Sequence, residues 1–153
     1  MAGLVASLQP ACLFVDFDRT LCSTKGGSPL AGRPSVDDEL VGLCAQMEGR
    51  AHVVTRNPHV DEIRTFLAAK GLPRLLVHRV VPPRSKAEVV CDPRWLEAAA
   101  GSGAPERAGG PVVLFVDDTL GEHLDDEMRS APNVIRFLFT RARATQTTDR
   151  LPT

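Results

Sequence analysis

The chain is poor in lysine, has little net charge and lacks a long apolar run. Its 18 basic residues include only Lys25, Lys70 and Lys86 as lysines, so a lysine near a predicted site is more informative than an arginine. The formal net charge of −1 gives no overall attraction to nucleic acid or to an anionic membrane. No segment approaches the roughly 20 apolar residues of a membrane-spanning helix. Residues 1–10 lack the basic start and apolar length of a signal peptide.

Metal-binding or redox cysteine motifs are also missing. The four cysteines form no CxxC pair and have no metal-ligand spacing. Cys12 lies in an apolar run and Cys44 on the apolar stripe of a predicted helix, so both are expected in the core. Unpaired thiols favour a reducing compartment, and we therefore expect a soluble cytoplasmic protein without membrane partners. The sequence leaves the oligomeric state open, and an oligomer is compatible with it.

Short apolar runs alternate with helical patterns along the chain, which is long enough for one domain. The first run, Ala11–Val15, has no polar alternation, as in a strand buried on both faces of a parallel sheet. This alternation predicts an α/β fold with a Rossmann-like doubly wound parallel sheet of five strands. We expect one domain over residues 1–139 and a poorly ordered polar tail over 140–153. The other predicted strands are Ala51–Thr55, Leu75–Val81, Val112–Val116 and Val134–Phe139.

The predicted helices follow capping residues and apolar stripes. Ser35 is expected to cap one helix, and Asn57 another, with Pro58 at its first position. Cys22–Pro34, rich in Gly, Ser and Pro, should form a loop that lies beside the first strand end as a flap. Gly101–Pro111 should be a surface loop. Further helices are expected at Ser85–Cys91, Pro93–Ala100 and Leu120–Arg129.

Polar side chains follow the predicted strands. Asp16 and Asp18 come after the first strand and share one side of it, and Thr55 ends the second. Lys86 follows the third, and the pair Asp117-Asp118 ends the fourth. Because the carboxyl ends of parallel strands meet at one edge, these groups should converge there. Such a set suits a hard cation such as Mg²⁺ and phosphoryl transfer, with Asp16 as nucleophile and Asp18 as general acid and base.

These residues carry a family resemblance. In chain order, Asp16-Phe-Asp18-Arg-Thr20, Thr55, Lys86 and Asp117-Asp118 resemble the four motifs of the haloacid dehalogenase superfamily of phosphatases. The resemblance spans Leu13 to about Asp118 and implies a core with strand order 5-4-1-2-3 and a Mg²⁺ cofactor. It implies metal ligation by Asp16, by Asp117 and by the main-chain carbonyl of Asp18, with Asp118 helping through a water or by holding Lys86.

Neither gap between the motifs has room for the cap domain that many members of this superfamily carry. The site should be open, which in that family goes with macromolecular or bulky phosphorylated substrates. The phosphorylated partner could be a protein, a nucleic-acid end or a small molecule. The Thr55-Arg56 pair and Pro83-x-Ser-Lys86 resemble the small magnesium-dependent phosphatases. The expected substrate-binding residues are Thr55, Arg56, Lys86 and Arg19, the last standing where the family motif often has Gly.

Other functions fit fewer of these residues. A non-catalytic phosphate-binding or scaffold protein on the same fold would need no general acid, yet both Asp16 and Asp18 are present. A phosphotransferase would usually need a cap to exclude water. A response-regulator receiver has its acidic pair and its phosphorylated Asp in a different order. A two-residue metal motif of the glycosyltransferase type leaves the other strand ends unexplained. We therefore expect a capless Mg²⁺-dependent phosphatase.

Overall fold

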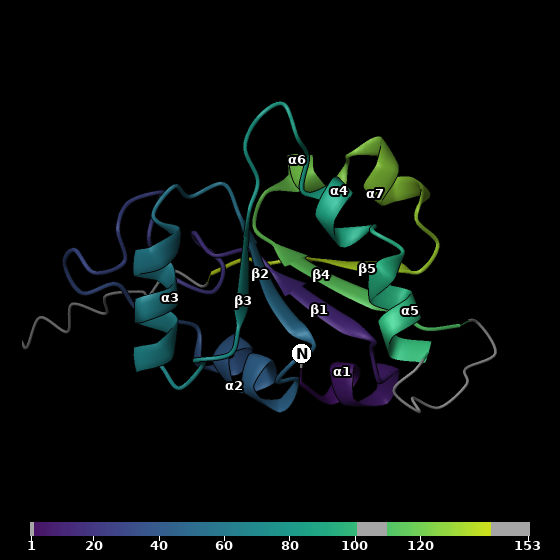
Figure 1. The fold of residues 1–153 in the computed structure, drawn as a ribbon, viewed down its shortest axis with the longest axis horizontal. Coiled ribbons are helices and arrows are strands. Elements are labelled where there is room, and N and C mark those ends of the chain that lie inside the picture. The colour runs from purple at the N-terminus through teal and green to yellow at the C-terminus, as the bar shows by residue number, and fades with distance from the viewer. Residues whose placement is uncertain (1, 101–109, 142–153) are drawn as a thin grey trace, which may run out of the picture.

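The computed structural model describes residues 2–100 and 110–141, which form an α/β fold around a five-stranded, all-parallel sheet (Figure 1). The strand order is β3-β2-β1-β4-β5, which read from the opposite edge is 5-4-1-2-3. β1 is therefore central, with Phe14 level with His52 on one side and Phe115 on the other. The strands are β1 Cys12–Val15, β2 Ala51–Thr55, β3 Leu76–Arg79, β4 Val113–Asp117 and β5 Val134–Leu138.

Helices cover both faces of the sheet. The side chains of β1 alternate between two apolar cores, as the period of a strand requires. Leu13 and Val15 join the core that also contains residues of α1 Ala2–Leu8, α2 Asp38–Gln46 and α3 Val60–Ala69. Cys12 and Phe14 join the second core, under α4 Ala87–Val90, α5 Arg94–Ala100 and α7 Asp126–Ser130. The remaining helix, α6 Leu120–His123, follows β4.

The sequence located the strands well and several helix boundaries less well. β2 has the predicted bounds. β1, β3 and β5 lie inside their predicted ranges, and β4 is shifted by one residue from its predicted range. The helix α1 was not predicted. The predicted helix Leu120–Arg129 is in fact α6 and α7, because Asp125 adopts an extended ψ of 134° and accepts hydrogen bonds from the N–H groups of Glu127 and Met128. The predicted Gly101–Pro111 loop and the polar tail lie largely outside the described residues.

Both predicted helix caps were wrong. α2 begins at Asp38, and its N-cap is Asp37, whose side chain accepts from the Leu40 N–H. Ser35 instead pairs with Ser23 across the base of the flap, where the chain is extended. α3 begins at Val60 after His59, and Asn57 lies in the turn before it. A residue with good capping chemistry is thus used for other contacts when the tertiary structure offers them.

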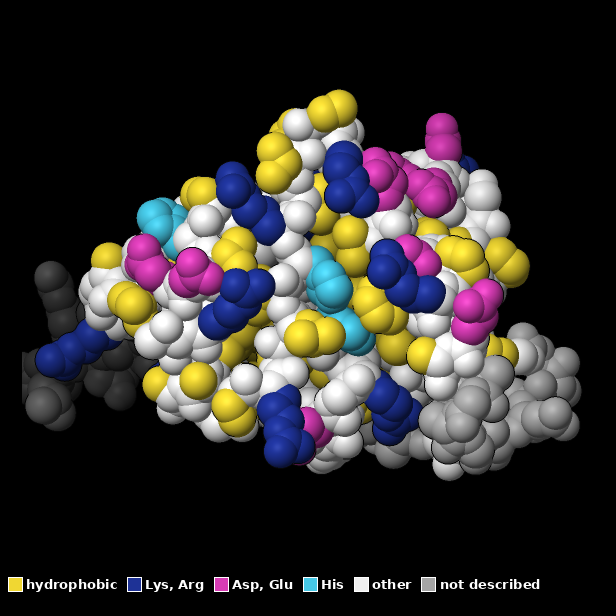
Figure 2. All heavy atoms as spheres, viewed as in Figure 1, with side chains coloured by type: hydrophobic (Ala, Val, Ile, Leu, Met, Phe, Trp, Pro, Cys, Tyr) yellow, Lys and Arg dark blue, Asp and Glu magenta, His cyan; other side chains and the backbone are white. Residues whose placement is uncertain are grey.

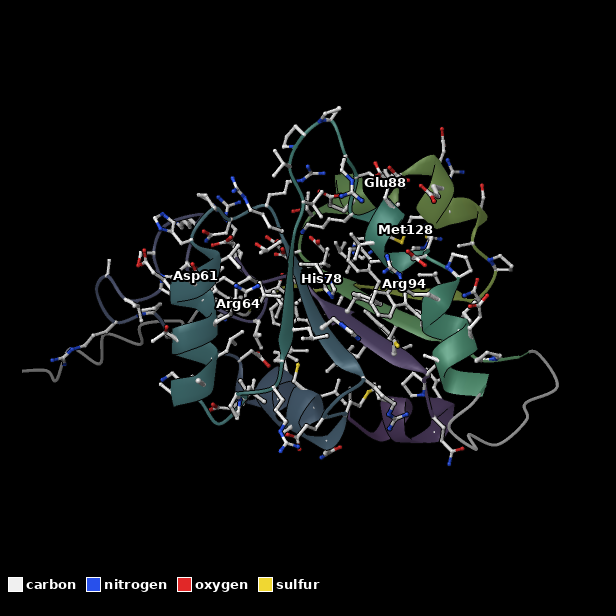
Figure 3. The ribbon with its side chains drawn as sticks, viewed as in Figure 1. Asp61, Arg64, His78, Glu88, Arg94 and Met128 are labelled. Carbon is white, nitrogen blue, oxygen red and sulfur yellow. The ribbon has the colours of Figure 1, made fainter. Side chains whose placement is uncertain are left out.

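One face of the sheet carries a cluster of aromatic rings and imidazoles. His52 stacks on Phe14 with ring centroids 4.9 Å apart, and its Nδ1 lies 3.0 Å from Nε2 of His78. Trp95 packs edge-on against this group. Figure 2 shows imidazoles at the middle of this face with basic side chains around them. A hollow lies between β3 and α5, and His78 and Arg94, labelled in Figure 3, are among the residues that line it. Burial lowers the pKa of His52 to about 4 and also lowers the pKa of His78, so both imidazoles are neutral at pH 7.

In the part of the chain that the structure describes, no helix is both long enough and apolar enough to cross a lipid bilayer.

Candidate active site

A hollow of about 380 Å³ lies at the carboxyl ends of the central strands, where the sequence predicts the site. Six of the predicted residues line it, and two more, Thr55 and Asp117, are fully buried. Between Asp16 and Thr55 the chain forms the flap and α2, and between Thr55 and Lys86 it forms α3 and β3. Neither segment contains a cap domain. The predicted residues that line the hollow are Asp16, Asp18, Arg19, Arg56, Lys86 and Asp118.

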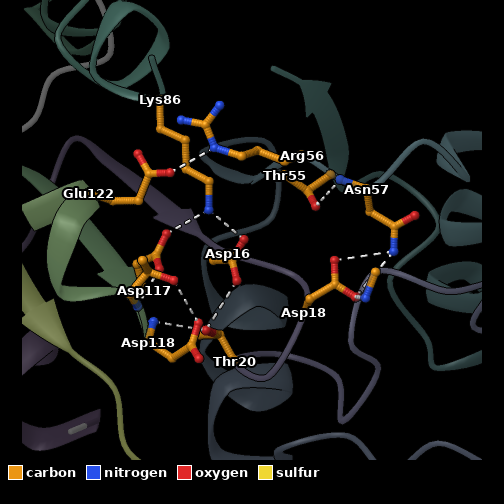
Figure 4. Close-up of polar contacts among 12 residues, drawn as sticks. Asp16, Asp18, Thr20, Thr55, Arg56, Asn57, Lys86, Asp117, Asp118 and Glu122 are labelled. Carbon is orange, nitrogen blue, oxygen red and sulfur yellow. Dashed lines mark hydrogen bonds and ion pairs between the residues drawn. The ribbon is translucent and has the colours of Figure 1, made fainter. Parts of the chain in front are cut away.

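Lys86 is the buried centre of the site. Its Nζ donates to Asp16 Oδ1 and to Asp117 Oδ2, both at 2.6 Å, although these residues are on three separate segments of the chain (Figure 4). Only 3% of Lys86 is exposed, and Asp16 and Asp117 are equally enclosed. A buried ammonium between two carboxylates is stable only with such short, direct contacts, because each charge has lost its water. Within the described residues, the carboxylates of Asp16 and Asp117 therefore share the single positive charge of Lys86.

The electrostatics of this group show a deficit of positive charge. Burial raises the pKa of the Asp16 carboxyl to about 7, with Lys86 acting in the opposite direction and the neighbouring Asp117 adding to the rise. The two carboxylates in turn raise the pKa of Lys86 against the effect of its burial. Lys86 is therefore charged at neutral pH, while the Asp16 carboxyl keeps a proton more readily than an ordinary aspartic acid.

A third carboxylate completes an acidic cluster. One oxygen each from Asp16, Asp117 and Asp118 can be chosen so that all lie within 4.8 Å of one another. Thr20 orders this group: its hydroxyl donates to Asp16 Oδ2 at 3.3 Å and accepts from the Asp118 N–H at 3.1 Å. Thr119 N–H donates to Asp117 Oδ1 at 2.7 Å. The three carboxylates and Lys86 together carry a formal excess of two negative charges.

Asp18 lies apart from that cluster. Both of its carboxylate oxygens accept from Nδ2 of Asn57 at 3.1 Å, and Oδ1 also accepts from the Gly26 N–H at 2.6 Å. The same amide donates to the Gly27 carbonyl, and Oδ1 of Asn57 accepts from the His59 N–H. Through these hydrogen bonds the amide of Asn57, which is only 2% exposed, joins Asp18, the flap and the start of α3. Asp18 still lines the hollow, and its orientation is set before a ligand enters.

Thr55 ends β2, and Arg56, the next residue, lies in different surroundings. The Thr55 hydroxyl is buried and accepts from the Asn57 N–H at 3.1 Å. Arg56 extends across the hollow, where its Nε donates to Glu122 at 2.8 Å and its Nη1 to the Arg84 carbonyl at 3.3 Å. These contacts fix the Arg56 guanidinium on the rim of the hollow.

Arg19 has an unusual backbone conformation. Its φ is +60°, in the left-handed region that costs a residue with a side chain about 1–3 kcal/mol. Its N–H donates to the Thr24 carbonyl at 3.0 Å, and its own carbonyl accepts from Nε of Arg141 at 3.3 Å. Arg141 also donates to the Thr20 carbonyl at 3.1 Å. The turn after Asp18 is thus held from both sides, while the Arg19 side chain is exposed on the hollow.

The predicted residues lie together in or beneath this hollow, and the structure adds three contacts that the sequence did not indicate. Thr20 was noted in the first motif without a role, although its place four residues after Asp16 is a usable signal. Asn57 is predicted as a helix cap, because asparagine suits that role as well as it suits holding the Asp18 carboxylate. Glu122 had no local signal, because its partner Arg56 is 66 residues away in the chain.

Comparisons of this chain with protein-family models, with curated proteins and with solved structures found no match. The residues, their spacing and the geometry of the site are therefore the basis for any functional assignment.

Proposed function

We propose that this protein is a Mg²⁺-dependent phosphatase, a phosphoric monoester hydrolase of the haloacid dehalogenase type that acts through an aspartyl phosphate on Asp16. The observation that supports this most strongly is the buried Lys86 ammonium, 2.6 Å from both Asp16 and Asp117, in a cluster that borders an open hollow. A nucleophilic carboxylate needs adjacent positive charge to approach a phosphate dianion, and Lys86 provides one such charge.

The donor set fits a hard divalent cation. Mg²⁺ prefers oxygen ligands and commonly uses one or two carboxylates, keeping waters for the remaining positions. Asp16, Asp117 and Asp118 offer such oxygens, with an excess of negative charge that Lys86 alone leaves unbalanced. When bound, the cation supplies positive charge that offsets the charge on the phosphoryl oxygens. The Asp18 side chain is not part of this cluster, so its share in ligation is limited to the main-chain carbonyl proposed for it.

The residues of the chain account for both halves of the reaction. A carboxylate oxygen of Asp16 attacks phosphorus, and a new O–P bond forms as the ester O–P bond breaks. Asp18 gives its proton to the departing ester oxygen, which leaves as an alcohol. Asp18, now ionised, then takes a proton from a water whose oxygen attacks phosphorus. The acyl-phosphate O–P bond breaks, inorganic phosphate leaves, and Asp16 is restored.

The surrounding contacts support these roles. Lys86 and Thr20 hold the two oxygens of Asp16, and Asn57 holds Asp18, so the nucleophile and the acid are positioned on separate supports. Arg56, fixed by Glu122, supplies N–H donors at the rim for the substrate phosphate. The hollow is open, and water can reach the acyl phosphate, so hydrolysis is better supported than transfer to another acceptor.

Intact-mass measurement of two variants tests the covalent mechanism. Asp16→Asn removes the nucleophile, so it should acquire no phosphate when mixed with an aryl phosphate and Mg²⁺. Asp18→Asn keeps the nucleophile and loses the acid and base, which should lower turnover by about 10²–10⁴-fold and allow phosphoenzyme to accumulate. Asp38→Asn, an exposed change in the first turn of α2, is the matched control. A covalent phosphate on Asp16→Asn would refute the assignment of the nucleophile.

A further inference from the structure

Two cations on the hollow have no acidic partner in the described part of the chain. Lys86 is held by Asp16 and Asp117, and Arg56 by Glu122. Arg19 and Lys25 also line the hollow, both are exposed, and neither has an ion pair or a side-chain hydrogen bond within residues 2–100 and 110–141. Two cations on the hollow are therefore not paired with a carboxylate of the described residues.

Arg19 occupies a backbone position that favours glycine. Its φ of +60° is in the left-handed region, and hydrogen bonds with Thr24 and Arg141 hold the peptide groups on both sides of it. A glycine there would remove the strain, yet the chain has an arginine at that point, exposed and lining the hollow. Strained residues of this kind are concentrated at functional sites, so the outlier itself points to a role for the side chain.

Lys25 is connected to the same part of the site from the flap. The next residue, Gly26, donates its N–H to Asp18 at 2.6 Å, and Gly27 accepts from Asn57. The segment that contains Lys25 is therefore tied to the residue proposed as the general acid. Arg19 directly follows that acid in the chain, so both cations lie on segments fixed to Asp18.

We propose that Arg19 and Lys25 form a subsite for a second anionic group of the substrate. The substrate class is then a phosphomonoester that bears another phosphate or a carboxylate close to the ester, with the reacting phosphoryl group at Asp16 and Lys86. The proposal rests on the proposed function only in placing the reacting phosphoryl group at Asp16 and Lys86. Charge-assisted hydrogen bonds from a guanidinium fork and an ammonium suit either anion. A hollow of about 380 Å³ is large enough for both groups of a small ligand.

Calorimetric titration with phosphonates tests the subsite without turnover. The probes are ethylphosphonate, which has one anionic group, and two ligands with a second one, 3-phosphonopropionate and ethane-1,2-bisphosphonate. Each is titrated in saturating Mg²⁺ into the wild type, Arg19→Gly, Arg19→Asn and Lys25→Ala. Asn tolerates positive φ, so Arg19→Asn separates loss of the cation from any change in backbone freedom. Arg74→Gly, an exposed arginine at the opposite end of the sheet, is the control.

The wild type and Arg74→Gly should bind at least one doubly anionic probe about tenfold more tightly than ethylphosphonate. Tighter binding of 3-phosphonopropionate would identify the second group as a carboxylate, and tighter binding of ethane-1,2-bisphosphonate would identify it as a phosphate. In both Arg19 variants this ratio should fall toward one, and in Lys25→Ala it should fall part of the way, while the melting temperature of Arg19→Gly is no lower than that of the wild type. Chelation of Mg²⁺ by a probe affects all variants equally and leaves their comparison intact.

Three outcomes overturn the subsite: a ratio near one in the wild type, an unchanged ratio in both Arg19 variants, or no binding of any probe. The last would also remove the phosphate site on which the proposed function depends. If the ratio depends on Arg19 and no aryl phosphate is hydrolysed, the subsite stands and the proposed hydrolase activity is wrong.

Discussion

Lys86→Met should reveal how strongly the buried ion pairs determine the stability of this protein. Methionine keeps most of the length of the side chain and removes the ammonium. Asp16 and Asp117 then face each other's charge in a site where at most 5% of either residue is exposed. Removing one partner of a buried ion pair costs about 3–5 kcal/mol. With a urea m-value of about 2 kcal/mol/M, the unfolding midpoint should fall by about 2 M.

The loss should depend on pH in a specific direction. Burial raises the pKa of Asp16 to about 7 while Lys86 opposes that rise, so the pKa of Asp16 should be higher still in Lys86→Met. A group whose pKa is raised in the folded state contributes stability at low pH and loses it as the pH rises through that pKa. The variant therefore takes up its proton at a higher pH than the wild type. Its deficit should be greatest near pH 9 and narrow toward pH 7, by at most about 1.4 kcal/mol per pH unit.

Urea unfolding in EDTA at pH 7, 8 and 9 measures this effect without a bound cation. Lys70→Met is the matched control, because Lys70 is exposed and its described contact is with the ring of Phe66 at 5.4 Å. That contact is worth about 1 kcal/mol at most. A Lys86→Met deficit below about 1 kcal/mol at pH 9, or one that does not change with pH, would refute the electrostatic reasoning.

Two further measurements address the metal cluster and the imidazole cluster. Mg²⁺ should raise the melting temperature of the EDTA-treated protein, by the equivalent of about 2.7 kcal/mol at a hundredfold excess over the dissociation constant. Asp118→Asn should reduce that rise, because Asp118 belongs to the acidic cluster. No rise in the wild type would contradict a cation site. The pKa of His52 is lowered to about 4, so the unfolded chain takes up a proton first and the wild type should lose stability as the pH falls from about 6.5 to 4, by at most about 3 kcal/mol. Denaturant unfolding of His52→Gln should show a smaller loss of stability over that range. An identical loss in the variant would contradict a lowered pKa of His52.

The positions of the strands could be read from the sequence because each depends on its own residues. Runs such as Cys12–Val15 are apolar throughout, and the observed strand is fully buried, as a central parallel strand must be. The site residues followed from the same rule, since a polar group after each strand end reaches one edge of a parallel sheet. Asp16, Lys86 and Asp117 were predicted together for this reason and are in direct contact.

Helix starts were harder to predict because capping residues have other uses. Ser35 and Asn57 are both good caps by type, yet the Ser35 hydroxyl accepts from Arg141 and the Asn57 amide holds Asp18. Their side chains can bond locally or with distant segments, and the distant partners exist only in the folded chain. Asp125 divides the last predicted helix by the same kind of local hydrogen bonding, which the apolar pattern around it does not reveal.

The sequence by itself determined the fold class, the strands and the edge of the sheet where charged residues gather, because these depend on patterns within a few residues. Only the tertiary structure decided which charges pair. Lys86 reaches Asp16 across 70 residues, Arg56 is fixed by Glu122 across 66, and Arg141 holds the turn at Arg19 across 122. The same structure placed Arg19 at a positive φ and left it and Lys25 without acidic partners in the described residues. Pairing energies depend on separation and burial in space, and neither quantity is encoded in the spacing along the chain.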